Sequence, residues 1–148
     1  MMGAGQPIVG YVPGAFDMFH IGHLNILRNA AMRCDVLVAG VVIDHVVLEM
    51  KGARPVIPLE ERLAIVSAID VVDEAIIDES VDKRLAWRTY PFDVVFKGSD
   101  WFGTERGARL EKQMAEIDVR VEYLPYTRDT SSTLLREALG RLVNAPAR

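Results

Sequence analysis

The stretch Gly14-Ala15-Phe16-Asp17-Met18-Phe19-His20-Ile21-Gly22-His23 decides the fold of this chain. It follows Ile8 to Val12, an apolar run typical of a buried β-strand, and it opens residues 21–33, where apolar side chains recur at helical spacing. His20 and His23 therefore stand where a helix would begin. A helix N-terminus attracts anions through its free backbone N–H groups and roughly half a unit of positive charge. The pattern predicts a strand-to-helix turn suited to a polyphosphate.

Strand-like and helix-like segments alternate along the rest of the chain. The runs that predict strands are residues 8–12, 35–43, 74–77, 92–96 and 119–124. The segments that predict helices are residues 21–33, 82–89, 105–116, 131–143 and one opening at Pro58, with Leu59, Leu63, Val66 and Ile69 on its apolar face. Residues 44–50 are ambiguous, and Lys51 to Pro58 predicts a loop by its glycine and prolines. This alternation predicts an α/β fold: a doubly wound, five-stranded, mostly parallel sheet with helices on both faces.

Size and composition are those of a soluble globular protein. We expect one domain over residues 1–148, with a loose tail at residues 144–148. The net charge of −4 argues against a broad nucleic-acid-binding face. The single cysteine, Cys34, excludes an internal disulfide and fits a buried packing residue better than a reactive thiol. No cleavable leader is visible and the longest apolar run, Val36 to Ile43, is too short to cross a membrane, so we expect a cytoplasmic protein.

The unusual side chains all follow predicted strands. These segments are Gly14–His23, Asp44–Lys51, Lys97–Trp101 and Tyr126–Thr133. Ligands of open α/β sheets bind beyond the carboxyl ends of the strands, where the strand order switches. We therefore expect the four segments to form one site.

His20 and His23 share a face of the predicted helix because they are three residues apart. Gly22 leaves room for a ligand to approach the backbone, and each imidazole can donate an N–H to a phosphate oxygen. The spacing by itself also fits two capping histidines. A metal pair would need a third ligand with matching spacing, and none stands out, so no metal site is predicted.

Phe16-Asp17-Met18-Phe19-His20-Ile21-Gly22-His23 resembles the G-x-F-D-x-x-H-x-G-H signature of the cytidylyltransferase-like nucleotidyltransferases. The resemblance extends from about Ile8 to about Leu139, and it is strongest to the bacterial glycerol-3-phosphate cytidylyltransferases. Its further matches are Glu61-Arg62, Lys97-Gly98-Ser99-Asp100-Trp101, and Tyr123-Leu124-Pro125 before Ser131-Ser132-Thr133. The family implies a Rossmann-like fold, a nucleoside triphosphate with Mg²⁺, pyrophosphate release and a homodimer.

The resemblance also implies a role for each matched position. It places His20, His23 and Lys51 in catalysis. The positions that it assigns to the nucleotide are Gly14, Ala15, Phe16, His20, Gly22, His23, Lys97, Gly98, Asp100, Tyr126, Arg128, Ser131, Ser132 and Thr133. The positions that it assigns to the second substrate are Asp17, Lys51, Arg62 and Trp101.

Each of these positions also has a plain structural interpretation. Lys51 and Arg54 fit solvated surface side chains, and Glu61-Arg62 fits an exposed helical pair. Asp100 fits a turn residue, and Trp101 fits a cover for the core. The hydroxyls of residues 130–133 fit a helix N-cap, a role that is compatible with phosphate binding at the same helix end.

Two stretches depart from the family's pattern. Cytidylyltransferases carry R-T-x-G-I-S-T-[ST] before the last helix, but here Tyr126 stands at the arginine position, Asp129 at the glycine position, and Arg128 two residues late. Ala15 replaces the usual threonine of the first motif. Related adenylyltransferases also lack that arginine, so the choice between CTP and ATP stays open.

The implied reaction is transfer of CMP from CTP to a phosphorylated alcohol, most simply glycerol 3-phosphate. Catalysis would consist of positioning and charge stabilisation, because the attacking phosphate is already anionic. The alternatives are an adenylyltransferase that uses ATP with a sugar or flavin phosphate, and a non-catalytic nucleotide-binding module. Choline or ethanolamine phosphates would need an aromatic or acidic pocket, for which Trp101, Phe19, Tyr126 and Asp17 are candidates. The expected partners are CTP or ATP, a small phosphorylated substrate and a second copy of the chain, without nucleic acid or membrane insertion.

Overall fold

The computed structural model describes residues 5–126 and 131–144. In this part of the chain the strands are β1 (Val9–Gly14), β2 (Val36–Val42), β3 (Glu74–Asp78), β4 (Val94–Gly98) and β5 (Arg120–Leu124). Neighbouring strands all run parallel, in the order β3-β2-β1-β4-β5. The strand order reverses beside β1, which is where such sheets bind ligands. The predicted α/β fold is confirmed, and its sheet is wholly parallel.

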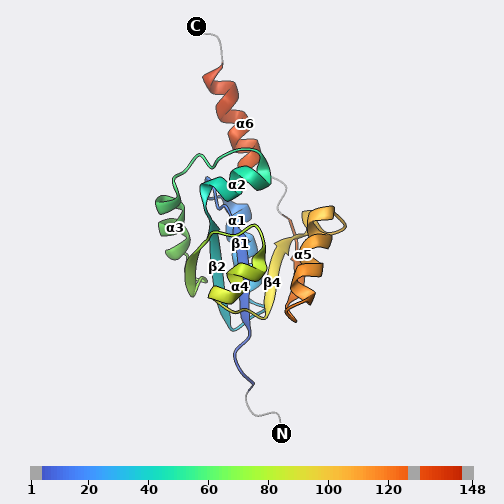
Figure 1. The fold of residues 1–148 in the computed structure, drawn as a ribbon. Coiled ribbons are helices and arrows are strands. Elements are labelled where there is room, and N and C mark those ends of the chain that lie inside the picture. Colours follow the sequence, from blue (N-terminus) through green and yellow to red (C-terminus); the bar gives the residue numbers. More distant parts are fainter. Residues whose placement is uncertain (1–4, 127–130, 145–148) are drawn as a thin grey trace.

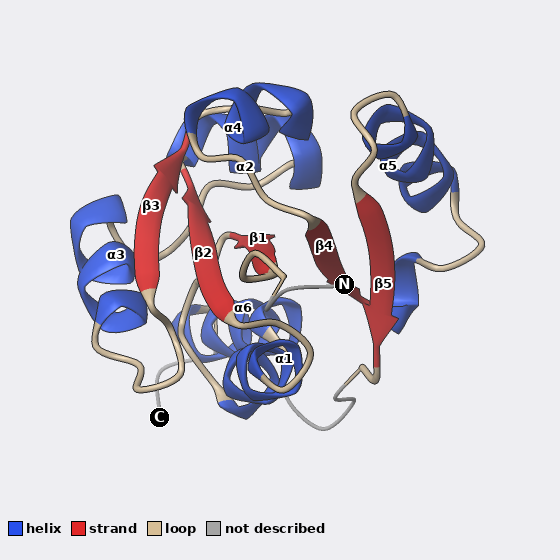
Figure 2. Cartoon of the chain, turned by 90° about the horizontal axis from the view of Figure 1, so that it is seen from below, coloured by secondary structure: helices blue, strands red, loops and turns tan. Residues whose placement is uncertain are grey.

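Helices cover both faces of the sheet. They are α1 (Ile21–Ala31), α2 (Asp44–Lys51), α3 (Leu59–Ser67), α4 (Lys83–Thr89), α5 (Glu105–Ala115), α6 (Ser132–Val143) and the 3-10 turn η1 (Ser99–Trp101). One core cluster joins the sheet to α1 and α3 through Leu27 and Val66, and the other joins it to α4 and α5 through Ala86 and Leu110. Figure 2 shows α4 and α5 on one side of the sheet and α1 on the other. In Figure 1, α2 lies over the carboxyl ends of the strands and α6 extends beyond them.

The central strands are buried on both faces, which explains their valine-rich sequences. Tyr11 of β1 is fully buried and stacks on Phe92, with the ring centroids 4.5 Å apart. A Cβ at position 40 would lie 1.8 Å from the Tyr11 hydroxyl oxygen. Gly40 of β2 is therefore required to make room for this tyrosine.

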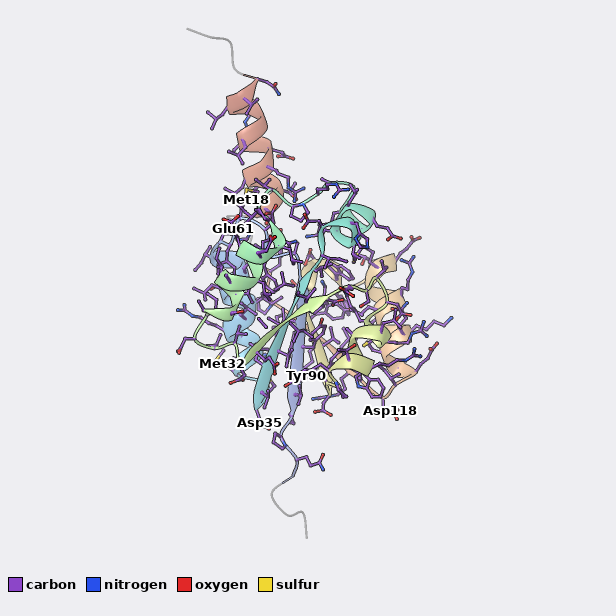
Figure 3. The ribbon with its side chains drawn as sticks, turned by 60° about the vertical axis from the view of Figure 1, so that its left-hand side comes forward. Met18, Met32, Asp35, Glu61, Tyr90 and Asp118 are labelled. Atoms are coloured by element: carbon purple, nitrogen blue, oxygen red, sulfur yellow. The ribbon has the colours of Figure 1, made fainter. Side chains whose placement is uncertain are left out.

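Aspartates hold the strands together at their amino ends. Asp35 precedes β2 and accepts a hydrogen bond from the Ile8 N–H at 2.7 Å, and Asp93 precedes β4 and accepts one from the Val9 N–H at 2.8 Å. Figure 3 shows Asp35 at this end of the molecule and Met18 near the opposite end. The two carboxylates fix the start of β1 against both of its neighbours, far from the edge where ligands are expected.

The structure differs from the predicted elements mainly at residues 44–51. This segment forms α2, which ends at Gly52 with a φ of 77°, a left-handed conformation that favours glycine. Lys51 is thus the last residue of a helix and not part of the predicted loop. Strand β4 continues to Gly98, beyond its predicted end at Phe96. Residues 145–148 of the predicted tail lie outside the described residues. Among the residues that the structure does describe, no helix has the length and hydropathy that a membrane span needs.

Candidate active site

The loop between β1 and α1 has an uncommon backbone. Phe16 and Met18 adopt φ values of 52° and 48°. Non-glycine residues rarely enter this region, and such residues cluster at functional sites. The buried Phe16 ring packs near the rings of Phe19 and His23. Aromatic packing therefore holds the turn from which α1 begins, and Phe16 is left only its main chain for any contact with a nucleotide.

His20 and His23 cap α1 reciprocally. His20 is the N-cap residue, and its Nδ1 accepts a hydrogen bond from the Gly22 N–H at 3.0 Å. The Nδ1 of His23 accepts one from the His20 N–H at 3.2 Å. Because each neutral ring uses Nδ1 as an acceptor, its proton lies on Nε2, which stays available as a donor. The cap thus occupies the Gly22 amide but leaves two imidazole N–H groups for an anion.

Both imidazoles are poor bases in this environment. Burial lowers the pKa of His20 below its ordinary value. Burial, followed by the charges of His20 and Lys51, lowers the pKa of His23 to about 3. The two rings are therefore neutral near pH 7, and each offers one N–H beside the partial positive charge at the N-terminus of α1.

Asp17 joins this turn to the loop that follows α2. Its side chain is 1% exposed, and its carboxylate oxygens accept hydrogen bonds from the N–H groups of Val56 and Ile57, both at 2.8 Å. The predicted contact between Asp17 and the second substrate is wrong, because the carboxylate is turned to the loop. Its role is to fix the loop that follows α2 against the turn between β1 and α1.

Arg62 is also a structural residue. Its side chain is 0% exposed, and its Nη1 donates to the carbonyls of Ala15 and Val42 at 2.7 and 2.8 Å. The Nε donates to the Ile57 carbonyl at 3.0 Å, and the Nη2 forms an ion pair with Asp44 at 2.6 Å. The predicted contact between Arg62 and a substrate phosphate is therefore wrong, since the guanidinium is buried and bound to protein oxygens.

A pocket of about 380 Å³ opens beside the histidine turn, at the carboxyl ends of the strands. Gly14 and Ala15 form the wall that adjoins the turn, and α2, α4 and α5 supply other walls. The charged side chains that line it are Lys51, Lys83, Lys97, Arg106, Arg109 and Glu49. Because cations predominate, the pocket is suited to an anionic ligand.

Lys97 and Arg106 both lie over the ring of Trp101, which lines the pocket. The Nζ of Lys97 is 3.9 Å from the ring centroid, and the Cζ of Arg106 is 4.6 Å from it. Burial, followed by the charges of Lys51 and Lys83, lowers the pKa of Lys97 to about 7. Burial and neighbouring arginines also lower the pKa of Lys51. An anion in the pocket would relieve this repulsion and raise the pKa of both lysines.

Lys83, the first residue of α4, is held at the pocket by a buried network. Its Nζ donates to Asp78 at 2.9 Å and to the Ser80 carbonyl at 2.6 Å. Asp78 also accepts the hydroxyl of Tyr11 at 2.5 Å. Burial acts to raise the pKa of Asp78, but the Lys83 charge and these hydrogen bonds hold it below its usual value. Two of the three ammonium hydrogens are therefore engaged, and one is left for a ligand.

The start of α6 approaches the same turn. The Ser131 Oγ caps α6 by accepting the Leu134 N–H at 3.1 Å. The Ser132 Oγ donates to the Asp17 carbonyl at 2.6 Å. Thr133 is exposed. The predicted N-cap is confirmed, and Ser132 serves first to bring α6 to the first turn.

The other predicted positions follow strands β4 and β5. A Cβ at position 98 would lie 2.6 Å from the Asp100 carboxylate, so Gly98 lets this side chain fold back over the strand end. Tyr126 follows β5 and is 46% exposed. Arg128 lies outside the described residues, and its contact with a phosphate stays a prediction.

Sequence reasoning did not select Lys83, Arg106 or Arg109. The two arginines offered a signal, since residues three apart share a helix face and these follow the matched Trp101 directly. Lys83 offered none, because its place at the pocket depends on the network with Asp78.

The model of the cytidylyltransferase-like family matches residues 11–138. FAD synthase of Thermococcus kodakarensis is 31% identical over 134 residues, which are 89% of each chain. Ethanolamine-phosphate cytidylyltransferase of Arabidopsis thaliana is 42% identical over 101 residues, or 64% of this chain and 24% of that protein. The bifunctional protein HldE of Acidiphilium cryptum is 35% identical over 133 residues, or 86% of this chain and 26% of that protein. The chain thus spans about a quarter of the length of the Arabidopsis and Acidiphilium proteins.

The fold has a counterpart among solved structures. A lipopolysaccharide core biosynthesis protein from Thermoplasma volcanium superposes with a TM-score of 0.69 and 26% sequence identity, covering 84% of this chain and 99% of that one. Family match, related sequences and structural likeness agree on the family and the fold. The chain belongs to the cytidylyltransferase-like family.

Proposed function

We propose that this protein is a nucleotidyltransferase that moves CMP from CTP onto the phosphate of a phosphorylated alcohol and releases pyrophosphate. The observation that carries the proposal is the reciprocal cap of His20 and His23 at the start of α1. Neither histidine lines the cation-rich pocket itself, but the turn that carries them begins at Gly14 and Ala15, which form one of its walls. A triphosphate at the start of α1 and an acceptor phosphate in the pocket would meet at Gly14 and Ala15. That meeting point is the strand-order switch of the sheet.

The chemistry needs no nucleophile from the protein, because the acceptor phosphate is already anionic. Its oxygen attacks the α-phosphorus, the bond to the bridging oxygen breaks, and pyrophosphate leaves with the electron pair. His20 and His23 would donate Nε2–H to phosphate oxygens, and Lys51 would neutralise charge on the transferring group. Removing one such donor typically lowers a rate by about 10²–10³-fold.

A nucleoside triphosphate would bring Mg²⁺ into this site. In the described part of the chain, no three His, Cys, Asp or Glu side chains gather to hold a metal. Phosphate oxygens and waters would therefore supply most ligands, as is usual for Mg²⁺. Asp100 is exposed at the end of β4 and fits a contact through a bound water. The ion would supply charge neutralisation on the phosphates.

A second candidate is adenylyl transfer from ATP. It is favoured by Tyr126, which stands where cytidylyltransferases carry an arginine, and by the FAD synthase that matches along 89% of its own length.

The homodimer that the resemblance implies is a separate expectation, for which light scattering on the purified chain is the measurement. Neither adenylyl transfer nor a homodimer changes the role proposed for the histidine turn.

The test is pyrophosphate release by the purified protein. CTP and ATP are each supplied with Mg²⁺ and with glycerol 3-phosphate, ethanolamine phosphate, a sugar phosphate or a flavin phosphate. We expect release with CTP and a phosphorylated alcohol, for which glycerol 3-phosphate is the simplest acceptor. Pyrophosphate release with ATP and an acceptor, but not with CTP, would favour adenylyl transfer. Tight nucleotide binding without pyrophosphate from any acceptor would contradict both and identify a non-catalytic module.

A further inference from the structure

We infer that the part of the pocket formed by Lys83, Arg106 and Arg109 binds a second anionic group of the acceptor, either a carboxylate or a phosphate. This inference rests on the proposed function and narrows its acceptor class. The acceptor would carry one phosphate toward Gly14 and Ala15, where transfer takes place, and an anionic group at its other end. We call these three cationic residues the distal anion site.

The two arginines of the distal anion site have no ion-pair partner among the described residues. Asp78 pairs with Lys83, but no carboxylate in residues 5–126 and 131–144 forms an ion pair with Arg106 or Arg109. Glu49 is the single carboxylate among the described residues that line the pocket. Several cations that face one pocket without counter-ions repel one another, and a ligand with more than one negative group removes that cost.

The arginines are held in place by the way α5 packs. Thr104 caps α5, accepting the Gly107 N–H at 3.1 Å and donating to the Trp101 carbonyl at 2.6 Å. A Cβ at position 107 would lie 2.1 Å from that carbonyl oxygen, so Gly107 is required for the helix to pack this closely. Arg106 and Arg109 share the helix face that lines the pocket. Their guanidinium groups can bind a carboxylate or phosphate bidentately.

The same geometry disfavours a cationic acceptor. Recognition of an ammonium group requires an open aromatic face or a carboxylate. The Trp101 ring already carries Lys97 at 3.9 Å and Arg106 at 4.6 Å from its centroid. Ethanolamine phosphate would place its ammonium in a pocket where five cationic side chains outweigh the single carboxylate of Glu49. We therefore expect an acceptor different from the one named for the Arabidopsis relative.

Matched ligands test the distal anion site directly. D-3-Phosphoglycerate differs from glycerol 3-phosphate by a carboxylate in place of a hydroxymethyl group, and glycerol 1,3-bisphosphate replaces that hydroxyl by a phosphate. In calorimetric titrations of the full chain, we expect at least one of these ligands to bind about tenfold to a hundredfold more tightly than glycerol 3-phosphate. The ligand with the larger gain in affinity identifies the second anionic group as a carboxylate or a phosphate. Equal affinities for all three, or tighter binding of ethanolamine phosphate, would overturn the inference.

Variants locate the effect on α5. Arg109→Gln should abolish the preference for the doubly anionic ligand, and Lys112→Gln should keep it, since Lys112 is exposed on α5 outside the pocket. Arg109 is itself exposed, so its variant should fold, and circular dichroism checks this. An unchanged preference in Arg109→Gln would contradict the site. The titration requires no turnover: a protein that binds 3-phosphoglycerate but releases no pyrophosphate with any nucleotide would refute the proposed function alone.

Discussion

The Nδ1 of His23 accepts a hydrogen bond from the main-chain N–H of His20 at 3.2 Å, and the centroids of the two imidazole rings lie 3.9 Å apart. The Nδ1 of His20 is likewise occupied, by the Gly22 N–H. Both Nε2 atoms therefore carry the ring proton, and one local arrangement begins α1 and supplies two donors for an anion. The first prediction follows from this pairing.

Replacing His23 should separate catalysis from folding. In His23→Ala the His20 N–H loses its acceptor, which should cost about 1 kcal/mol of stability, as for other cap residues. The lost Nε2–H donor should lower pyrophosphate release by a factor on the order of 10². His45→Ala is the matched control, because His45 is exposed on α2. Near-normal turnover in His23→Ala would remove the histidine pair from the mechanism.

Acid should destabilise the protein through His23. Its pKa is about 3 in the folded chain and 6.5 at its ordinary value. Between these values the unfolded state binds a proton that the folded state does not, so stability should fall as the pH drops from 6.5 toward 3. The slope from one such group is at most about 1.4 kcal/mol per pH unit. Urea unfolding at pH 7, 6 and 5 should show a shallower decline in His23→Gln than in the wild type, while His45→Gln should decline as the wild type does. Parallel curves for His23→Gln and the wild type would contradict the lowered pKa.

Binding of the acceptor phosphate in the pocket should take up protons through Lys97. The pKa of Lys97 is about 7 without a ligand, so the amine is mostly neutral at pH 8. An incoming phosphate raises the pKa of Lys97, and affinity for the phosphorylated acceptor should therefore weaken as the pH rises above 7. Calorimetry at pH 8 in two buffers of different ionisation enthalpy measures the uptake. We expect a smaller uptake in Lys97→Met and an unchanged one in Lys112→Met; equal uptake in all three proteins would exclude Lys97.

Arg62 should be a residue of stability. Arg62→Met keeps a long apolar side chain but leaves Asp44 and the carbonyls of Ala15, Val42 and Ile57 without their donor. Each buried carbonyl left without its donor typically costs about 1–3 kcal/mol, whereas the Asp44 side chain is 39% exposed and can turn to water. Arg141→Met, on the exposed part of α6, should change stability by less than about 0.5 kcal/mol. Urea unfolding measures both, and equal midpoints for the two variants would show that the buried guanidinium contributes no net stability.

The fold could be predicted from sequence because its signals are local. The valine-rich runs and intervening amphipathic segments indicate parallel strands and helices without knowledge of long-range contacts. Residues 44–50 are ambiguous in sequence because Val46 and Val47 favour a strand by propensity. In the structure both are buried against the first turn in a small cluster with Ala15, which holds the segment as a helix.

The site could be predicted only in part. His20 and His23 were selected because a helix start and a motif coincide in one short stretch. Arg62 and Asp17 were misassigned because their partners come from remote segments that only the fold brings together. Lys83 gives no signal in the sequence, because its direct partners Asp78 and Ser80 are local and only the fold brings it to the pocket. A charged residue in a motif therefore indicates a site, but its neighbours in space decide whether it contacts a ligand or other parts of the protein.

The most direct test of the proposed histidine turn is a crystal structure of the protein with CTP and Mg²⁺. We expect phosphate oxygens within hydrogen-bond distance of the Nε2 atoms of both His20 and His23, at the N-terminus of α1. A triphosphate bound elsewhere, with both Nε2–H groups bonded to protein atoms, would contradict the role given to these histidines.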